Sequence, residues 1–303
     1  MYKKETFTAV ILFFILQICF AQSSFQNLEL GKNSLNYKGN PLKATDRKSL
    51  AFSDKGAWFG FGFLEQSEMQ GGFSGPFLMT EQNGVWLSSS FISLHLTDKN
   101  EQELIDWKTA LVNQNSYNSH LEQEFQNEKL EVKQQLVFSS GHSAIQKTSI
   151  TNRSSKTITL YPIYNSKTYL DNMQLSTEGQ FLKLVSSKSN AVGYIQFFNE
   201  GIDIVITKDS FTAKTNKLTL KPNETKEIVV SQTYIFPQYD WKKENENLAE
   251  IQFNTVLKDT KKEKENQLAQ LIAKKKSIYK GAEYSIFIAK LLLTLQNNTR
   301  IPA

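Results

Sequence analysis

The side chains that could do chemistry in this 303-residue chain are one serine and a few carboxylates, all near a glycine-rich stretch. Ser74 lies between two glycines, but the spacing is not G-x-S-x-G and no histidine is positioned by pattern to activate it, so we reject a serine hydrolase. Two carboxyl groups at a suitable separation could act as general acid and general base. The candidates are Asp54, Glu65, Glu68 and Glu81. The sequence does not place any two of these carboxyl groups at a catalytic separation, so we interpret them as loop and surface groups.

Metal and thiol chemistry are not indicated. The three histidines, His95, His120 and His142, are widely spaced with no H-x-x-x-H pattern, so each is predicted to be a surface or strand residue and not a ligand. Cys19 is the only cysteine, and it lies in a segment that we expect to be removed. The mature chain is therefore expected to have no disulfide, no thiolate nucleophile, no metal site and no cofactor.

The stretch from 56 to 91 holds seven of the fourteen glycines and two of the four tryptophans. Glycine permits tight turns and close approach, and aromatic rings beside such loops commonly hold sugar rings, so the stretch indicates a contact surface. The alternative is that its aromatic residues form the core of short strands joined by glycine turns. The candidate substrate or interdomain residues are Trp58, Phe59, Gly71, Gly72, Phe73, Gly75 and Pro76.

The order of these blocks is more specific than their composition. Gly-Ala-Trp at 56–58, Gly-Gly-Phe-Ser-Gly-Pro at 71–76 and Thr-Glu at 80–81 precede a strand that leads to Phe91. This order resembles the amino-terminal domain of glycoside hydrolase family 63, in particular its bacterial α-glucosidase-like members. The resemblance runs from about Asn27 to the last residue. Bacterial relatives often have His after Gly-Ala-Trp, whereas this chain has Phe59, which puts any role of that His in doubt here.

The resemblance implies a β-supersandwich, then a helical linker, then an (α/α)6 barrel that carries the chemistry. We accordingly predict a signal peptide at 1–21, a β-supersandwich domain at 22–238, a helical linker at 239–280 and the start of a truncated catalytic domain at 281–303. The fold class is therefore mainly β: an antiparallel β-supersandwich followed by helices, the last being the first helix of an incomplete barrel.

The amino terminus has the features of a secretory signal. Lys3 and Lys4 precede an apolar run that ends in a small residue, Ala21, and the run is too short to span a bilayer comfortably. We expect export to the periplasm or the extracellular space, with no membrane association after cleavage. A lipoprotein attached through Cys19 is a weaker alternative, because Ile18 is a poor residue before a lipidated cysteine.

The region up to about Gln238 has the alternation of antiparallel strands. The run 130–138 alternates apolar and polar residues, and a polar turn at 152–156 separates the next two runs. The other runs are 144–151, 157–161, 181–185, 191–198, 202–207, 218–220 and 227–235. More than ten short strands indicate two packed sheets, hence a sandwich.

Pro237 marks a change of composition toward helix. Residues 241–279 have the spacing of one or two amphipathic helices, and 282–296 is apolar around most of its circumference, which predicts a helix buried on several sides. The charged run 261–265 mixes lysine and glutamate at helical spacing, so we expect a solvated helix face and no nucleic-acid partner.

The family implies hydrolysis of α-linked glucose in oligosaccharides, with inversion, by an Asp and a Glu of the barrel. No residue of this chain inherits either role by motif, so no catalytic residue is predicted and the chain alone is expected to be inactive. We predict a non-catalytic amino-terminal domain that packs on the barrel, in cis or in trans, and shapes its substrate side. The alternatives are a stand-alone carbohydrate-binding module and the structural relic of a truncated gene.

Overall fold

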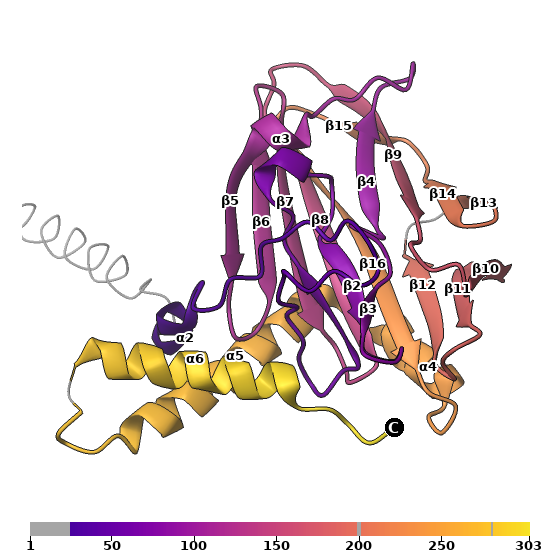
Figure 1. Cartoon of the computed structure of the whole chain (residues 1–303). Helices are drawn as coiled ribbons and strands as arrows, with labels where there is room; N and C mark the ends of the chain where they lie inside the picture. Colours follow the sequence, from indigo (N-terminus) through magenta and orange to yellow (C-terminus); the bar gives the residue numbers. More distant parts are fainter. Residues whose placement is uncertain (1–24, 199–200, 280) are drawn as a thin grey trace, which may run out of the picture.

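The computed structural model describes residues 25–198, 201–279 and 281–303 (Figure 1). The predicted signal peptide, with Cys19, lies outside these residues. The described strands are β1 (Phe59–Gly62), β2 (Ser74–Leu78), β3 (Val85–Trp86), β4 (Ser93–Thr97), β5 (Leu111–Ser116), β6 (Leu121–Gln126), β7 (Leu130–Phe138), β8 (Ser143–Asn152), β9 (Ile158–Lys167), β10 (Met173–Glu178), β11 (Phe181–Ser186), β12 (Val192–Phe197), β13 (Asp203–Ile206), β14 (Ser210–Lys214), β15 (Leu218–Leu220) and β16 (Thr225–Ile235). The helices are α2 (Gln26–Gly31), η1 (Gln66–Glu68), α3 (Trp107–Ala110), α4 (Trp241–Glu250), α5 (Phe253–Ala273) and α6 (Ala282–Asn298).

The strands form three antiparallel sheets. The largest has the order β10-β11-β12-β16-β8-β7-β6-β5. A second sheet is built around β9, which pairs with β14, β15 and β4. The glycine-rich stretch supplies a small third sheet, β1-β2-β3. Strands β7 and β8 pair in register from Leu130 with Asn152 to Phe138 with Ala144, and their length gives the large sheet a rigid centre.

The apolar core lies between the large sheet and the β9 sheet. Tyr164 of β9 meets Phe197 of β12, with ring centroids 5.1 Å apart, and Phe211 of β14 lies beside Phe197 at 6.4 Å. All three side chains are buried. Aromatic contacts between the two sheets define a sandwich, because each sheet buries one face against the other.

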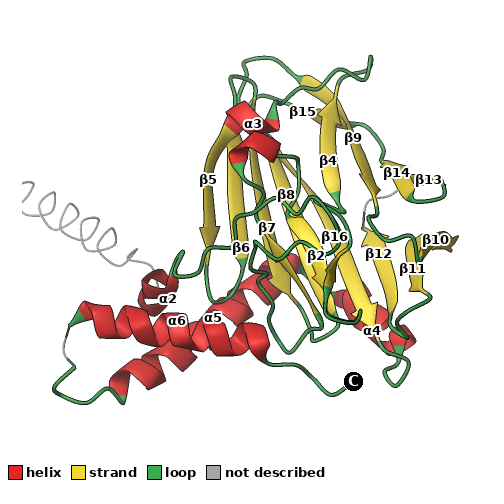
Figure 2. Cartoon of the chain, in the orientation of Figure 1, coloured by secondary structure: helices red, strands yellow, loops and turns green. Residues whose placement is uncertain are grey.

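Helices α2, α4, α5 and α6 gather at one end of the large sheet, whereas α3 lies at the other end (Figure 2). The side chain of Asp240 accepts hydrogen bonds from the backbone N–H groups of Lys242 and Lys243, which caps the first turn of α4. Helices α5 and α6 pack against each other and against α2. Within the described residues, no helix has the length and hydropathy that a bilayer-spanning segment needs.

The prediction of a mainly β fold with antiparallel sheets and carboxyl-terminal helices is confirmed. The run 130–138 forms β7 with the predicted bounds, and the predicted helix 282–296 becomes α6. The prediction that this helix is buried on several sides was wrong. Only Ser285, Ala289 and Leu293 are buried on α6. The reason is that the helix packs along one narrow stripe and leaves its remaining circumference open.

Candidate functional site

Most aromatic side chains of the glycine-rich stretch point into the core. Phe59 of β1 is fully buried, with its ring centroid 4.9 Å from that of Tyr234 and 5.2 Å from that of Phe138. Phe73 is 3% exposed and lies 5.9 Å from Phe63. A buried ring cannot lie on a sugar, so the interpretation of Phe59 and Phe73 as surface residues was wrong. The alternative reading, that these rings form the core of short strands, describes them.

The glycines and the proline of the predicted site are also buried. Gly71, Gly72, Gly75 and Pro76 are all inaccessible or nearly so, and the Gly75–Pro76 peptide bond is cis. A Cβ on Gly71 would lie 2.0 Å from the carbonyl oxygen of Leu94, so only glycine fits there. These residues let the loop approach β4 closely, and their contribution is to packing.

Trp58 alone among the candidate aromatics reaches a surface, where it holds the carboxyl-terminal segment. Its Nε1 donates to the carbonyl oxygen of Ile301 at 2.8 Å, and the backbone N–H of Ile301 donates to the carbonyl oxygen of Gly56, also at 2.8 Å. Gly56 has a φ of +78°, and a Cβ there would lie 2.8 Å from the nitrogen of Ile301. The Gly-Ala-Trp block is thus shaped to receive the segment that follows α6.

Further polar contacts extend this docking. Asn297 accepts from the backbone N–H of Ser53 at 3.1 Å and donates to the hydroxyl of Tyr37 at 2.6 Å. Asn118, in the turn between β5 and β6, donates to the carbonyl oxygen of Ala289 at 3.1 Å. We call the contacts of loop 53–58 and turn 117–120 with α5, α6 and segment 297–301 the seam.

The seam contains a buried ion pair. Nζ of Lys264, on α5, lies 2.7 Å from Oδ1 of Asp54, and the side chains are 6% and 1% exposed. Burial raises the pKa of the Asp54 carboxyl, and the ammonium of Lys264 opposes that rise. The prediction that 261–265 forms a solvated face was therefore wrong for Lys264. Lys264 is buried because it pairs with Asp54, which lies 210 residues away in the chain. Helical periodicity cannot reveal such a pairing.

The remaining chemistry-bearing residues do not form a catalytic group. Glu65 and Glu68 are exposed, and Ser74 is fully buried. Glu81 lines a polar pocket beside the β2–β3 turn. In the part of the chain that the structure describes, no cluster of three or more His, Cys, Asp or Glu residues could hold a metal ion.

The histidines have structural surroundings. His95 of β4 contacts Glu103 and lies 3.1 Å from Oδ1 of Asn165. His120 is 1% exposed and lies in turn 117–120, where burial lowers its pKa to about 4. The prediction of a surface or strand position was wrong for His120, because this turn is covered by the helices.

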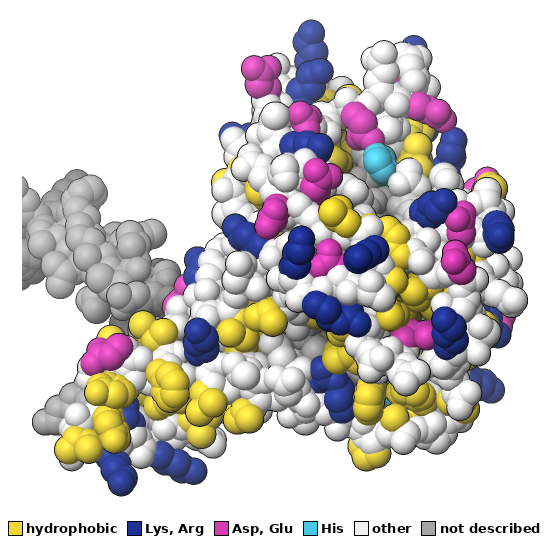
Figure 3. Space-filling view, viewed as in Figure 1, with side chains coloured by type: hydrophobic (Ala, Val, Ile, Leu, Met, Phe, Trp, Pro, Cys, Tyr) yellow, Lys and Arg dark blue, Asp and Glu magenta, His cyan; other side chains and the backbone are white. Residues whose placement is uncertain are grey.

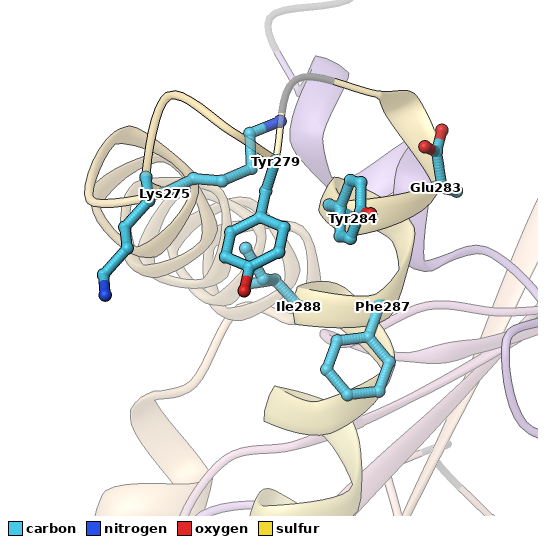
Figure 4. Close-up of a pocket in the computed structure, with 7 residues that line it drawn as sticks. Lys275, Tyr279, Glu283, Tyr284, Phe287 and Ile288 are labelled. Atoms are coloured by element: carbon cyan, nitrogen blue, oxygen red, sulfur yellow. The ribbon is translucent and has the colours of Figure 1, made fainter.

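Large apolar side chains cover the outer side of α6 (Figure 3). Phe287 is 62% exposed and Leu295 is 59% exposed, and Ile286 and Leu291 are also exposed. At the amino end of α6, Tyr279, Tyr284 and Phe287 line an open hollow of about 680 Å³ (Figure 4). Soluble domains rarely expose contiguous apolar surface of this kind unless something covers it.

Sequence reasoning missed the residues of the seam. Asn297 and Ile301 belong to residues 281–303, which the family resemblance assigned to the start of the next domain. Their partners, Gly56 and Trp58, were identified, but the pairing of the two segments was not. A glycine followed two residues later by tryptophan was the available signal, because it marks a backbone position open to close approach.

Part of the chain matches a known protein family. Residues 40–178, a little under half of the chain, match the family described as Glucosidase YgjK, N-terminal. This part of the chain is thus similar to the amino-terminal domain of a glucosidase, and it includes the whole glycine-rich stretch. No curated protein matches the chain.

Several solved structures resemble the chain at low sequence identity and with TM-scores below 0.5. A putative kojibiose phosphorylase from the human microbiome is 10% identical, with a TM-score of 0.48, covering 79% of this chain and 34% of that one. A family GH92 α-mannosidase from Bacteroides thetaiotaomicron is 10% identical, with a TM-score of 0.46, covering 80% and 38%. A putative aldose 1-epimerase from Escherichia coli is 8% identical, with a TM-score of 0.42, covering 61% and 98%. The chain spans about a third of the length of the first two.

Proposed function

We propose that this chain is the non-catalytic amino-terminal domain of an exported family 63-type α-glucosidase, which packs against an (α/α)6 catalytic domain in cis or in trans. The family match of residues 40–178 supports the glucosidase class. The observation that carries the docking role is the orientation of α6. The residues that α6 buries are Ser285, Ala289 and Leu293, whereas its large residues Phe287 and Leu291 face outward.

Apart from Leu293, this outward placement of large apolar residues is the reverse of the usual arrangement of a surface helix. Such a helix places large apolar residues inward and polar residues outward. Burying an exposed apolar side chain contributes roughly 1.5–3 kcal/mol, so covering Phe287, Leu291 and Leu295 would stabilise a complex substantially. A second, helical layer packed on α6 would supply that cover.

The chemistry is assigned to the partner. Inverting glycoside hydrolysis needs two carboxyl groups on opposite sides of the scissile bond. In this chain Asp54 is neutralised by Lys264 in the interior, and Glu65 and Glu68 lie exposed on a loop. We therefore assign both catalytic carboxyls to the barrel, α-linked gluco-oligosaccharides to its substrate class, and a position on the substrate side of the barrel to this domain. Export to the periplasm or cell exterior follows from the predicted signal peptide.

The test is the mass and solution state of the native product, isolated from the cell that makes it and assayed with 4-nitrophenyl α-glucoside. We expect the chain to be joined to, or associated with, a polypeptide that folds as an (α/α)6 barrel, and α-glucosidase activity to follow that species. The double variant Phe287→Ser, Leu291→Ser should release a separate partner, or loosen a fused one so that protease separates the two.

The control is Val205→Ser, which removes an apolar side chain of similar exposure, 57%, from β13 and should change nothing. Turnover of an α-glucoside by the purified chain alone would contradict the non-catalytic role. A native product that stays monomeric at the mass of this chain would contradict the docking role.

A further inference from the structure

A half-buried arginine lies just after the carboxyl end of α6 without an acidic partner. Nη1 of Arg300 donates to the carbonyl oxygen of Thr299 at 2.5 Å, and Nη2 donates to the sulfur of Met79. Neither acceptor carries a charge, and a guanidinium has five N–H donors. The carboxyl end of a helix supplies only about half a negative charge. Among the described residues, Arg300 therefore lacks a full counter-charge.

The missing counter-charge makes this position unfavourable for a cation. Burial lowers the pKa of the Arg300 guanidinium, and no carboxylate of the described residues opposes that shift. Arg153 shows the contrast, because its Nη1 lies 2.8 Å from Oε2 of Glu131. Withdrawing a cation from water costs free energy unless a negative group pairs with it. The surroundings of Arg300 therefore favour a carboxylate that comes from another part of the protein.

A carboxylate can reach the guanidinium, because Arg300 keeps part of its surface accessible and lines a hollow of about 270 Å³. Loop 49–51, the end of β2 and the end of α6 form the walls. The walls are largely apolar, with Leu50, Phe77 and Met79, and Arg300 is the one charged residue among the described residues that line the hollow. The volume lies below the roughly 300–1,000 Å³ of small-molecule sites, so the hollow suits a single side chain.

The hollow continues the exposed apolar side of α6. Phe287, Leu291 and Leu295 follow one another at four-residue spacing, so they lie along one side of the helix. Asn298, three residues after Leu295, lines the hollow. A surface that covers this side of α6 would therefore reach Arg300 at the carboxyl end of the helix.

Charge selects the kind of surface that fits. The only acidic residue of α6 is Glu283, in its first turn, whereas Lys290 and Arg300 place positive charge in its carboxyl half and just beyond it. An apolar surface that carries a carboxylate complements both the exposed apolar side chains and this charge. A purely apolar or a cationic partner would cover the guanidinium of Arg300 without a counter-charge, which is strongly destabilising.

We infer that an aspartate or glutamate of the catalytic domain enters this hollow and pairs with Arg300, while apolar side chains of the same surface cover the outward side of α6. The carboxylate accepts two N–H groups of the guanidinium, and its methylene groups lie against Leu50 and Phe77. The seam already holds the arginine in place, because the backbone N–H of Ile301 donates to Gly56, so pairing loses little entropy. The inference rests on the proposed function for the identity of the partner.

The test is carbodiimide cross-linking of the native product with the substitution Arg300→Lys, followed by mass spectrometry. The reagent joins a lysine amine to a carboxylate where the two groups are in contact. We expect a covalent link between position 300 and an aspartate or glutamate of the catalytic domain. Lys226 and Glu224, whose charged atoms lie 3.0 Å apart, are the internal positive control for the coupling.

A second variant measures what the pair contributes. Arg300→Met should weaken the association with a separate catalytic domain roughly tenfold, or raise the rate of proteolytic separation of a fused one to the same extent, because a carboxylate of the interface loses its partner. The melting temperature of this chain alone should not fall, since a poorly compensated charge is removed. The matched control is Arg153→Met, which changes an arginine paired with Glu131 and should associate as the wild type.

The outcomes separate this inference from the proposed function. The inference is overturned if position 300 forms no link to the catalytic domain, if it links only to this chain or to a second copy of it, or if Arg300→Met associates as the wild type. The docking role of α6 still stands after any of these results, provided that Phe287→Ser, Leu291→Ser releases the catalytic domain. A native product without a catalytic domain would overturn both.

Discussion

The sandwich interior and the seam hold the same chain together by different means. In the interior, rings such as Phe59 and Phe138 pack in a continuous apolar core that spans both sheets. Helices α5 and α6 attach to the sandwich partly through apolar contacts, since Leu293 of α6 joins its core and Phe253 and Leu257 of α5 cluster with Val137 and Ile145 of the large sheet. The seam adds directional contacts, such as Lys264 with Asp54 and Trp58 with Ile301.

The difference shows which contacts stabilise the fold and which contacts constrain the positions of the helices. Apolar burial is non-directional and scales with area, so it stabilises the sandwich without fixing one helix position. Polar contacts contribute less each, but their geometry is strict, and leaving one partner unpaired in the interior is costly. The directional contacts of the seam therefore add a geometric constraint to the apolar packing of α5 and α6 on the sandwich.

The variant Phe59→Ala is the strongest test of the claim that the sandwich interior provides most of the stability. Phe59 is fully buried against Tyr234 and Phe138, so its truncation should lower the free energy of unfolding by about 4 kcal/mol. Urea denaturation followed by tryptophan fluorescence measures it. Phe287→Ala removes the same side chain from an exposed position and should change stability by less than about 0.5 kcal/mol. Equal losses would mean that the interior does not dominate stability.

Breaking the buried ion pair should have the next largest effect. Lys264→Met leaves the Asp54 carboxylate buried without its partner, which should lower the free energy of unfolding by about 3 kcal/mol. The double variant Asp54→Asn, Lys264→Met should recover most of that loss, because no charge is then left buried. Lys262→Met, on the exposed side of α5, is the control. A double variant as unstable as Lys264→Met would show that the packing of the lysine stem, and not charge, is what matters.

Acid should weaken the seam before it weakens the interior. Burial lowers the pKa of His120 to about 4, below the ordinary value of about 6.5 that the unfolded chain retains. As the pH falls below 6.5 the unfolded chain binds the proton first, so stability that is fully present above pH 6.5 is lost progressively down to pH 4. At pH 5 the loss should be about 2 kcal/mol.

Neighbouring groups leave this pH window clear. Burial raises the pKa of Glu122, but contacts with His120 and Lys133 bring it down to about 2, so its stabilising contribution starts to fall only below about pH 4.5. Burial opposes the charge of Lys133, but hydrogen bonds with Glu122 and Glu124 raise its pKa above the ordinary value, whereas burial lowers the pKa of Lys261. Denaturation at pH 7 and pH 5, compared between the wild type and His120→Gln, isolates the effect of His120. An equal fall in both proteins would refute its role.

The smallest expected effect is local. Trp58→Phe removes the hydrogen bond from Nε1 to the carbonyl oxygen of Ile301, which should weaken docking of segment 297–301 by about 1 kcal/mol. Hydrogen exchange followed by mass spectrometry should show roughly fivefold faster exchange in that segment and unchanged exchange in β7 and β8. Faster exchange throughout the sheet would mean that the seam and the interior unfold together.

The interior was largely predictable from sequence and the seam was not. Alternation of apolar and polar residues located β7 and its neighbours, because half-buried strands carry that pattern locally. It did not show that Phe59 points inward, since β1 is buried on both faces and alternation then disappears. Lys264 and Ile301 contact partners more than 200 residues away, and no local pattern encodes such pairs.

The contact between Trp58 and Ile301 spans 243 residues of chain, which has a consequence for the timing of synthesis. The amino-terminal partner leaves the ribosome first and must wait until nearly the whole domain has followed. At about 5–20 residues per second that delay is on the order of 10–50 seconds. During it the backbone groups of Gly56 and the indole of Trp58 have only water or other partners. This corner of the molecule should therefore be the last to close, and the most open to chaperones during synthesis.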